Sequence, residues 1–134
     1  KYKISENKIN TPYVTSKEAL FHLFTSFAIE KDLEVTYIKL PNVFGEGQYK
    51  GNLWPSLRRA ALDGEDFIIY NKDVLKEFIS IKDAIEIISK TLGSKKDQQK
   101  KINVINVPGE KKSIYEFSSY HWKKWNASGR LLFK

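Results

Sequence analysis

Tyr13 and Lys17 are the two residues whose types and spacing most directly suggest chemistry. They lie four positions apart in a stretch with helical periodicity, so we expect them on one face of a helix. An ammonium group beside a phenol favours the phenolate and lowers the tyrosine pKa from its usual value of about 10. The pair therefore predicts a proton donor and acceptor that works near neutral pH. The alternative is structural, with Lys17 reaching water and Tyr13 covering the edge of the core.

The helix that must position this pair is predicted over residues 13–31. A strand should follow at residues 33–40, where β-branched and aromatic residues dominate. A helix that leads directly into a strand is typical of a parallel α/β fold. One apolar stripe along the helix predicts that this face is buried, and its residues are Leu20, Leu23, Phe24, Phe27 and Ala28.

Pro41 ends the predicted strand and Asn42 follows it at the carboxyl end, before a glycine-punctuated loop at residues 46–52. Ligands of open α/β sheets bind beyond the carboxyl ends of the strands, which makes Asn42 a candidate binding residue. An ordinary turn asparagine is the alternative. The remaining elements predicted are a helix at 53–62, a strand at 67–70, helices after the capping patterns Ser80/Asp83 and Ser113/Glu116, and a strand at 101–107.

Composition excludes several classes of protein. The 134 residues are enough for one core, and 41% hydrophobic content argues against a disordered chain. There is no cysteine, so disulfides and thiolate metal sites are excluded. No apolar run approaches the ~18 residues of a membrane span, and we expect a cytoplasmic protein without membrane contact. The net charge of +7 raises nucleic-acid binding as an alternative, but the lysines around residues 95–101 have no aromatic neighbours for base stacking.

Four motifs together resemble the extended short-chain dehydrogenase/reductase family, the NAD(P)-dependent nucleotide-sugar epimerases, dehydratases and reductases. The resemblance covers about residues 5–118, which correspond to the second half of a family member. The motifs are Pro-Tyr-x-x-Ser-Lys at 12–17, Lys-Leu-Pro-Asn-Val-Phe-Gly-Glu-Gly-Gln at 39–48, Phe-Ile-Ser-Ile-Lys-Asp-Ala at 78–84 and Asn-Val-Pro-Gly at 106–109.

The resemblance implies an α/β fold that is the C-terminal part of a Rossmann-type parallel sheet plus a small α/β substrate-binding subdomain. Residues 1–45 would complete the dinucleotide-binding domain, with the active-site helix and strand. Residues 46–134 would form the substrate-binding subdomain, interleaved with the Rossmann part. For a complete enzyme the resemblance implies a homodimer that uses NAD or NADP, a nucleotide-sugar substrate and a place in polysaccharide biosynthesis.

The resemblance also implies residue roles. Tyr13 would be the general acid/base, and Lys17 would tune it and bind the nicotinamide ribose. Pro41 would lie at the cofactor through its backbone, and Asn42 would contact the nucleotide-sugar. Lys76 stands where the family often has an arginine for the substrate diphosphate, and lysine keeps that charge without the bidentate fork.

Other family features are missing from these 134 residues. There is no Gly-x-Gly-x-x-Gly turn for a dinucleotide pyrophosphate, and the chain begins at Lys1 without any methionine. We therefore expect a fragment with negligible affinity of its own for NAD(H) or NADP(H). The alternative function is a truncated, non-catalytic remnant or interaction module. Of the remaining residues, His121 is predicted to be a packing residue, Arg58 and Arg59 a solvated face, and residues 126–134 match no pattern.

Overall fold

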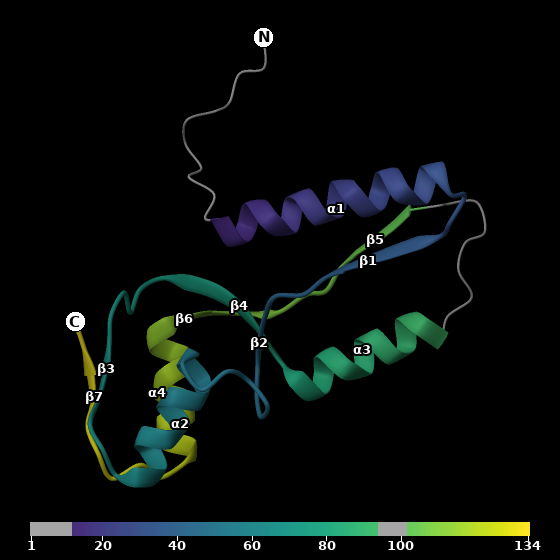
Figure 1. The fold of residues 1–134 in the computed structure, drawn as a ribbon. Helices are drawn as coiled ribbons and strands as arrows, with labels where there is room; N and C mark the ends of the chain where they lie inside the picture. Colours follow the sequence, from purple (N-terminus) through teal and green to yellow (C-terminus); the bar gives the residue numbers. More distant parts are fainter. Residues whose placement is uncertain (1–11, 94–101) are drawn as a thin grey trace. The chain divides into compact units, whose positions relative to one another are not determined.

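The computed structural model describes residues 12–93 and 102–134, and it divides the chain into two compact units. The first unit contains the described residues 12–38 and 102–105, and the second contains residues 39–93 and 106–134. Helices and strands are mixed throughout (Figure 1), which confirms the predicted α/β class. The functional boundary predicted between residues 45 and 46 concerns cofactor and substrate binding, and it stays a prediction.

In the first unit, helix α1 spans Pro12–Glu30, close to the predicted helix. Pro12 opens it, at a position where a missing N–H removes no helical hydrogen bond. The helix contacts strand β1 (Val35–Lys39) through the edge of the Phe21 ring, whose centroid is 4.8 Å from that of Tyr37. Strand β1 pairs with β5 (Ile102–Asn106) in a two-stranded sheet, and both strands fall inside the predicted ranges. Residue 101 of the predicted second strand lies outside the described residues.

The burial predicted for the apolar stripe of α1 is wrong for all but one of its residues. Ala28 is fully buried, but four larger side chains are 41–62% exposed, namely Leu20, Leu23, Phe24 and Phe27. The physical reason is the size of the first unit, because its described part offers only two short strands to cover a 19-residue helix. An uncovered apolar face of this size is the surface that soluble proteins normally bury against another segment.

The second unit is built around a three-stranded sheet in the order β2-β4-β6. Strand β2 (Asn42–Phe44) runs parallel to β4 (Leu75–Ser80), and β6 (Glu110–Ser113) runs antiparallel to β4. The glycine after β2 is required, because a Cβ on Gly45 would lie 2.5 Å from Cγ2 of Ile81 and its φ is 143°. Helix α3 (Ile81–Gly93) begins directly after β4.

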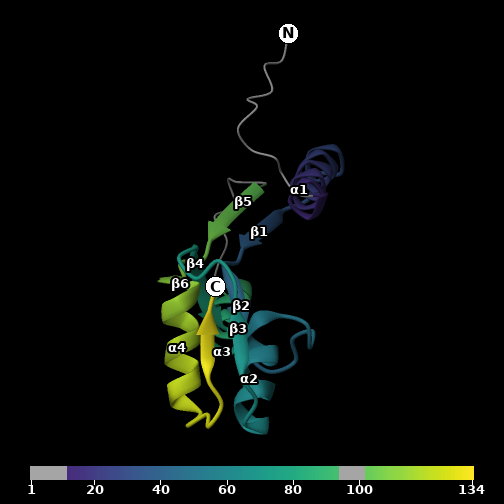
Figure 2. The ribbon, with the colours of Figure 1, turned by 90° about the vertical axis from the view of Figure 1, so that its left-hand side faces the viewer.

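The core of the second unit lies between two helices and a second, parallel pair of strands. Helix α2 (Leu53–Asp63) packs beside α4 (Ile114–Lys124), as Figure 2 shows, and β3 (Phe67–Ile69) pairs with β7 (Leu131–Phe133). The predicted helix 53–62 and strand 67–70 are therefore confirmed. The buried residues of this core are Leu57, Ala60, Ala61, Ile69 and Trp122.

Residues 126–134, which matched no sequence pattern, complete this core. The indole N–H of Trp122 donates to the carbonyl oxygen of Gly129 at 3.2 Å, and Asp66 accepts from both the backbone and the guanidinium of Arg130. A Cβ on Gly129 would lie 2.1 Å from the backbone oxygen of Glu65, so only glycine permits this close approach. The segment is held by Trp122, which is near in sequence, and by Asp66, which is far away in sequence.

Both predicted helix-capping patterns are confirmed. The backbone N–H of Asp83 donates to the Ser80 hydroxyl at 3.1 Å, at the start of α3. At α4, Ser113 and Glu116 form a reciprocal capping box. In the part of the chain that the structure describes, no helix is long and apolar enough to cross a membrane.

Candidate functional site

Helix α1 presents Tyr13 and Lys17 together on an exposed surface. The Lys17 ammonium lies 5.3 Å from the centre of the Tyr13 ring, and the Tyr13 side chain is 69% exposed. The first turn is tied by the Ser16 hydroxyl, which donates to the Tyr13 carbonyl oxygen at 2.7 Å. The Tyr37 hydroxyl of β1 donates to the Lys17 carbonyl oxygen at 3.4 Å. The phenol and the ammonium are thus neighbours that a substrate can reach.

The predicted binding residues of the second unit converge on strands β2 and β4. Asn42 is the first residue of β2, opposite Phe78 of β4, and its side-chain amide donates to the carbonyl oxygen of Glu77 at 2.9 Å. Within the described residues the oxygen of the Asn42 amide accepts no hydrogen bond, so it can accept one from a ligand. Pro41 packs closely against Gly109, where a Cβ would lie 2.9 Å from two carbons of the proline ring.

Lys76 lies on β4, two positions before Phe78 and therefore on the same face of the sheet. Its side chain is exposed and has no ion pair or hydrogen bond within residues 12–93 and 102–134. Directly opposite, on β6, stands Lys112. The sheet therefore brings Asn42 and Lys76 onto neighbouring strands, whereas Tyr13 and Lys17 belong to the other compact unit.

His121 is a packing residue, as predicted. It is 6% exposed, and its ring meets the rings of Phe44 and Phe117 edge-on at centroid distances of 5.2 and 4.6 Å. Burial lowers its pKa from 6.5 to about 4, and the charges of Lys124 and Lys112 act in the same direction. A neutral imidazole within an aromatic cluster supports the fold of the second unit.

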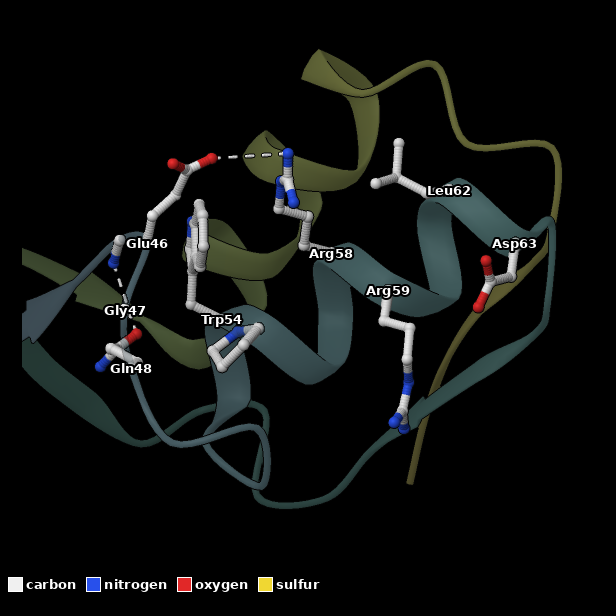
Figure 3. Close-up of a pocket in the computed structure, with 10 residues that line it drawn as sticks. Glu46, Gly47, Gln48, Trp54, Arg58, Arg59, Leu62 and Asp63 are labelled. Atoms are coloured by element: carbon white, nitrogen blue, oxygen red, sulfur yellow. Dashed lines mark hydrogen bonds and ion pairs between the residues drawn. The ribbon is translucent and has the colours of Figure 1, made fainter.

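The sequence did not indicate the hollow between the loop 45–48 and helix α2. Figure 3 shows this hollow, of about 390 Å³, with the side chains of Trp54 and Arg58 beside the loop. Arg58 was predicted to lie on a solvated face, but its guanidinium lies 5.8 Å from the centre of the Trp54 ring and 3.6 Å from a carboxylate oxygen of Glu46. Arg59 is exposed, as predicted. The spacing of Trp54, Arg58 and Leu62 along one helical face was the signal that could have revealed this hollow.

Among the residues that the structure describes, no cluster of three His, Asp or Glu side chains could hold a metal ion. The described side chains that could bind a ligand or take part in a reaction are therefore of three kinds. They are the phenol and ammonium of α1, the amide and lysines of the β2-β4-β6 sheet, and the arginines of α2.

Three solved structures share the fold along almost the whole chain. MoeE5, in complex with UDP-glucose and NAD, is 26% identical with a TM-score of 0.77, over 96% of this chain and 44% of that protein. UDP-N-acetylglucosamine 4-epimerase from Methanobrevibacter ruminantium, in complex with UDP-N-acetylmuramic acid, is 23% identical with a TM-score of 0.77, over 99% and 44%. UDP-glucose 4-epimerase from Thermotoga maritima, with UDP-glucose, is 16% identical with a TM-score of 0.78, over 93% and 40%.

The chain spans less than half the length of each of these proteins. Their shared fold supports the Rossmann-type α/β class that the sequence predicted. No curated protein sequence matches the chain. A family model described as the NAD dependent epimerase/dehydratase family matches residues 3–107. Since this match covers more than half of the sequence, the chain belongs to the NAD dependent epimerase/dehydratase family.

Proposed function

We propose that the chain supplies the proton-transfer residues and part of the substrate site of an NAD(P)-dependent enzyme that epimerises, dehydrates or reduces a nucleotide-activated sugar. The observation that carries the proposal is the Tyr13–Lys17 pair, exposed on α1 with the ammonium 5.3 Å from the ring centre. Family membership supports it, as do the UDP-sugars bound to MoeE5 and the two epimerases.

In the proposed mechanism, Tyr13 exchanges a proton with a hydroxyl or ketone of the sugar. Lys17 is proposed to assist this transfer, because its ammonium lies 5.3 Å from the centre of the Tyr13 ring. The Lys17 ammonium is also proposed to donate to the nicotinamide ribose. The cofactor, when bound, supplies the hydride acceptor and donor.

The residues present fit one end of a dinucleotide. Tyr13 and Lys17 on α1 are accessible, as groups that contact the nicotinamide end must be. Pro41, which belongs to the other unit, stays a separate proposed cofactor contact. A Gly-x-Gly-x-x-Gly turn for the pyrophosphate is not found in these 134 residues. We therefore propose that the chain holds the nicotinamide end of NAD or NADP and that another α/β segment holds the rest.

Substrate binding is assigned to the sheet of the second unit. The free amide oxygen of Asn42 accepts from a sugar or ribose hydroxyl, while its nitrogen remains bonded to Glu77 of β4. Lys76, which has no partner in the described part of the chain, binds the negatively charged diphosphate. These contacts are proposed to hold the substrate equally in the ground state and the transition state.

The exposed face of α1 favours a second candidate function. In the enzyme, a further α/β segment would cover side chains such as Leu23, which is 62% exposed. We propose that this enzyme is a homodimer in the cytoplasm.

The second candidate is a non-catalytic interaction module, in which the same face of α1 would bind a partner. Catalysis by the complete protein distinguishes the two candidates.

The test is Tyr13→Phe in enzyme expressed from the complete gene, with UDP-glucose and NAD as the first substrate pair. Removing the hydroxyl should lower kcat by ~10²-fold or more, the usual effect of losing a general acid/base. Tyr49→Phe, which removes the hydroxyl of another exposed tyrosine, is the matched control and should leave kcat unchanged.

Two further variants separate binding from chemistry. Asn42→Ala should mainly raise KM, because it removes uniform binding. Lys17→Ala should both raise KM and lower kcat, because Lys17 contacts the cofactor and tunes Tyr13. A Tyr13→Phe enzyme with wild-type kcat on a turned-over substrate would make Tyr13 structural and remove the basis of the proposed mechanism.

A further inference from the structure

The two faces of the β4–β6 ladder differ in their charge pairs: one face pairs an acid with a base and the other pairs two bases. On one face Glu77 stands opposite Lys111, so an acid meets a base. On the other face Lys76 stands opposite Lys112, so two ammonium groups project from the same side of adjacent strands. Opposed residues of an antiparallel pair have Cβ atoms about 4.5–5.5 Å apart, and like charges at that spacing destabilise the sheet.

Lys112 is held in place by its surroundings. Its ammonium lies 5.0 Å from the centre of the Tyr120 ring, its side chain is only 25% exposed, and it forms an ion pair of 2.8 Å with Glu110. Glu110 is itself 69% exposed, so this ion pair is worth little and its carboxylate can be exchanged for another anion. The lysine stem is fixed while its anionic partner is replaceable.

We infer that Lys112 and Lys76 together form a binding site for a phosphate-type anion, with one ammonium contributed by each strand. An anion between the two groups replaces their repulsion with two charge-assisted hydrogen bonds, which are the strong kind. Lysine suits this role because its ammonium is a compact point charge with three donors. The sequence gives no sign of Lys112, because only the strand register places it opposite Lys76.

This inference rests on the proposed function for the identity of the anion, which is then the diphosphate of the nucleotide-sugar. Lys112 becomes a second diphosphate-binding residue and compensates for the lysine that stands where the family often has an arginine. Two point charges from adjacent strands supply what one bidentate guanidinium would supply elsewhere.

Calorimetry of the 134-residue chain with inorganic pyrophosphate and with UDP tests the site. Lys112→Gln should weaken the binding of both probes by about tenfold, the effect of losing one hydrogen bond to a charged group. Lys76→Gln should weaken it similarly. Lys111→Gln is the matched control, because it removes the same charge from the same strand on the opposite face, and should change affinity by less than about twofold.

Thermal melts provide a second readout. Without an anion, Lys112→Gln should raise the Tm slightly or leave it unchanged, and pyrophosphate should raise the Tm of the wild type far more than that of the variant. Equal affinity of Lys112→Gln and wild type, or no pyrophosphate binding by the wild type, would overturn the two-lysine site. Loss of binding by Lys76→Gln alone would also overturn it, while leaving the proposed function intact. Conversely, wild-type kcat in Tyr13→Phe would overturn that function and leave the anion site standing.

Discussion

The two compact units bury apolar surface in different ways. In the second unit, Leu57 is fully buried, and a core of helices and strands closes around it. In the first unit, Leu23 also lies on a helix, α1, but it is 62% exposed. The second unit therefore contains its own stabilising core, whereas the first presents a surface that gains stability only when something else covers it. The candidate proton-transfer residues lie on the unit that lacks such cover.

The largest effect expected from this comparison is on the second unit. Leu57→Ala should lower its free energy of unfolding by about 2–5 kcal/mol, because the substitution opens a cavity in a closed core. Leu62→Ala on the same helix is the control, since that side chain is 62% exposed and its loss should cost less than about 0.5 kcal/mol. Urea denaturation followed by tryptophan fluorescence measures both. Equal losses at the two positions would mean that the unit has no specific core.

The burial of His121 in the aromatic cluster predicts that the stability of the second unit depends on pH. The folded-state pKa of His121 is lowered from 6.5 to about 4, so the unfolded chain takes up a proton at a higher pH than the folded chain does. The free energy of unfolding therefore keeps its full value above pH 6.5 and falls by up to about 3 kcal/mol as the pH drops to about 4. Denaturation midpoints across this range should decline in the wild type and much less in His121→Phe.

Exposed His22 offers the control for that experiment. His22→Gln is the matched variant, because it removes the other histidine of the chain, which lies on the exposed surface of α1. A slope that survives in His121→Phe would place its origin in other groups.

The smallest effect on stability, but a distinct effect on association, is expected on α1. Phe24→Ser should change the free energy of unfolding by less than about 0.5 kcal/mol, since the ring is 49% exposed. It should reduce the self-association of the 134-residue chain, because it removes apolar surface from the open face. Sedimentation velocity compares the variant with the wild type. A wild-type chain that is already a clean monomer would show that this face needs no cover.

Local signals made part of the fold predictable. Helix α1 and the two capped helices follow from periodicity and from Ser/Asp and Ser/Glu spacings, which involve only neighbours in sequence. Three short strands did not follow, since β2 and β6 depend on pairing with β4, and β7 is held beside Asp66, which is far away in sequence.

The candidate site also combines residues that could be predicted from local spacing with residues that could not. Tyr13 and Lys17 are one helical turn apart, and the structure places them together as the spacing predicted. Lys112 could not be predicted, because its position opposite Lys76 depends on how two strands align. The hollow beside Arg58 likewise depends on where a loop folds over a helix.

The parallel pairing of β3 with β7 sets an order for folding during synthesis. Residues 67–69 can pair only after residues 131–133 have been synthesised, and Asp66 can accept from the backbone N–H of Arg130 only then. Contacts of such long sequence separation form slowly. On the ribosome, helix α2 is therefore made long before its core can close, and its apolar face stays uncovered until β7 emerges.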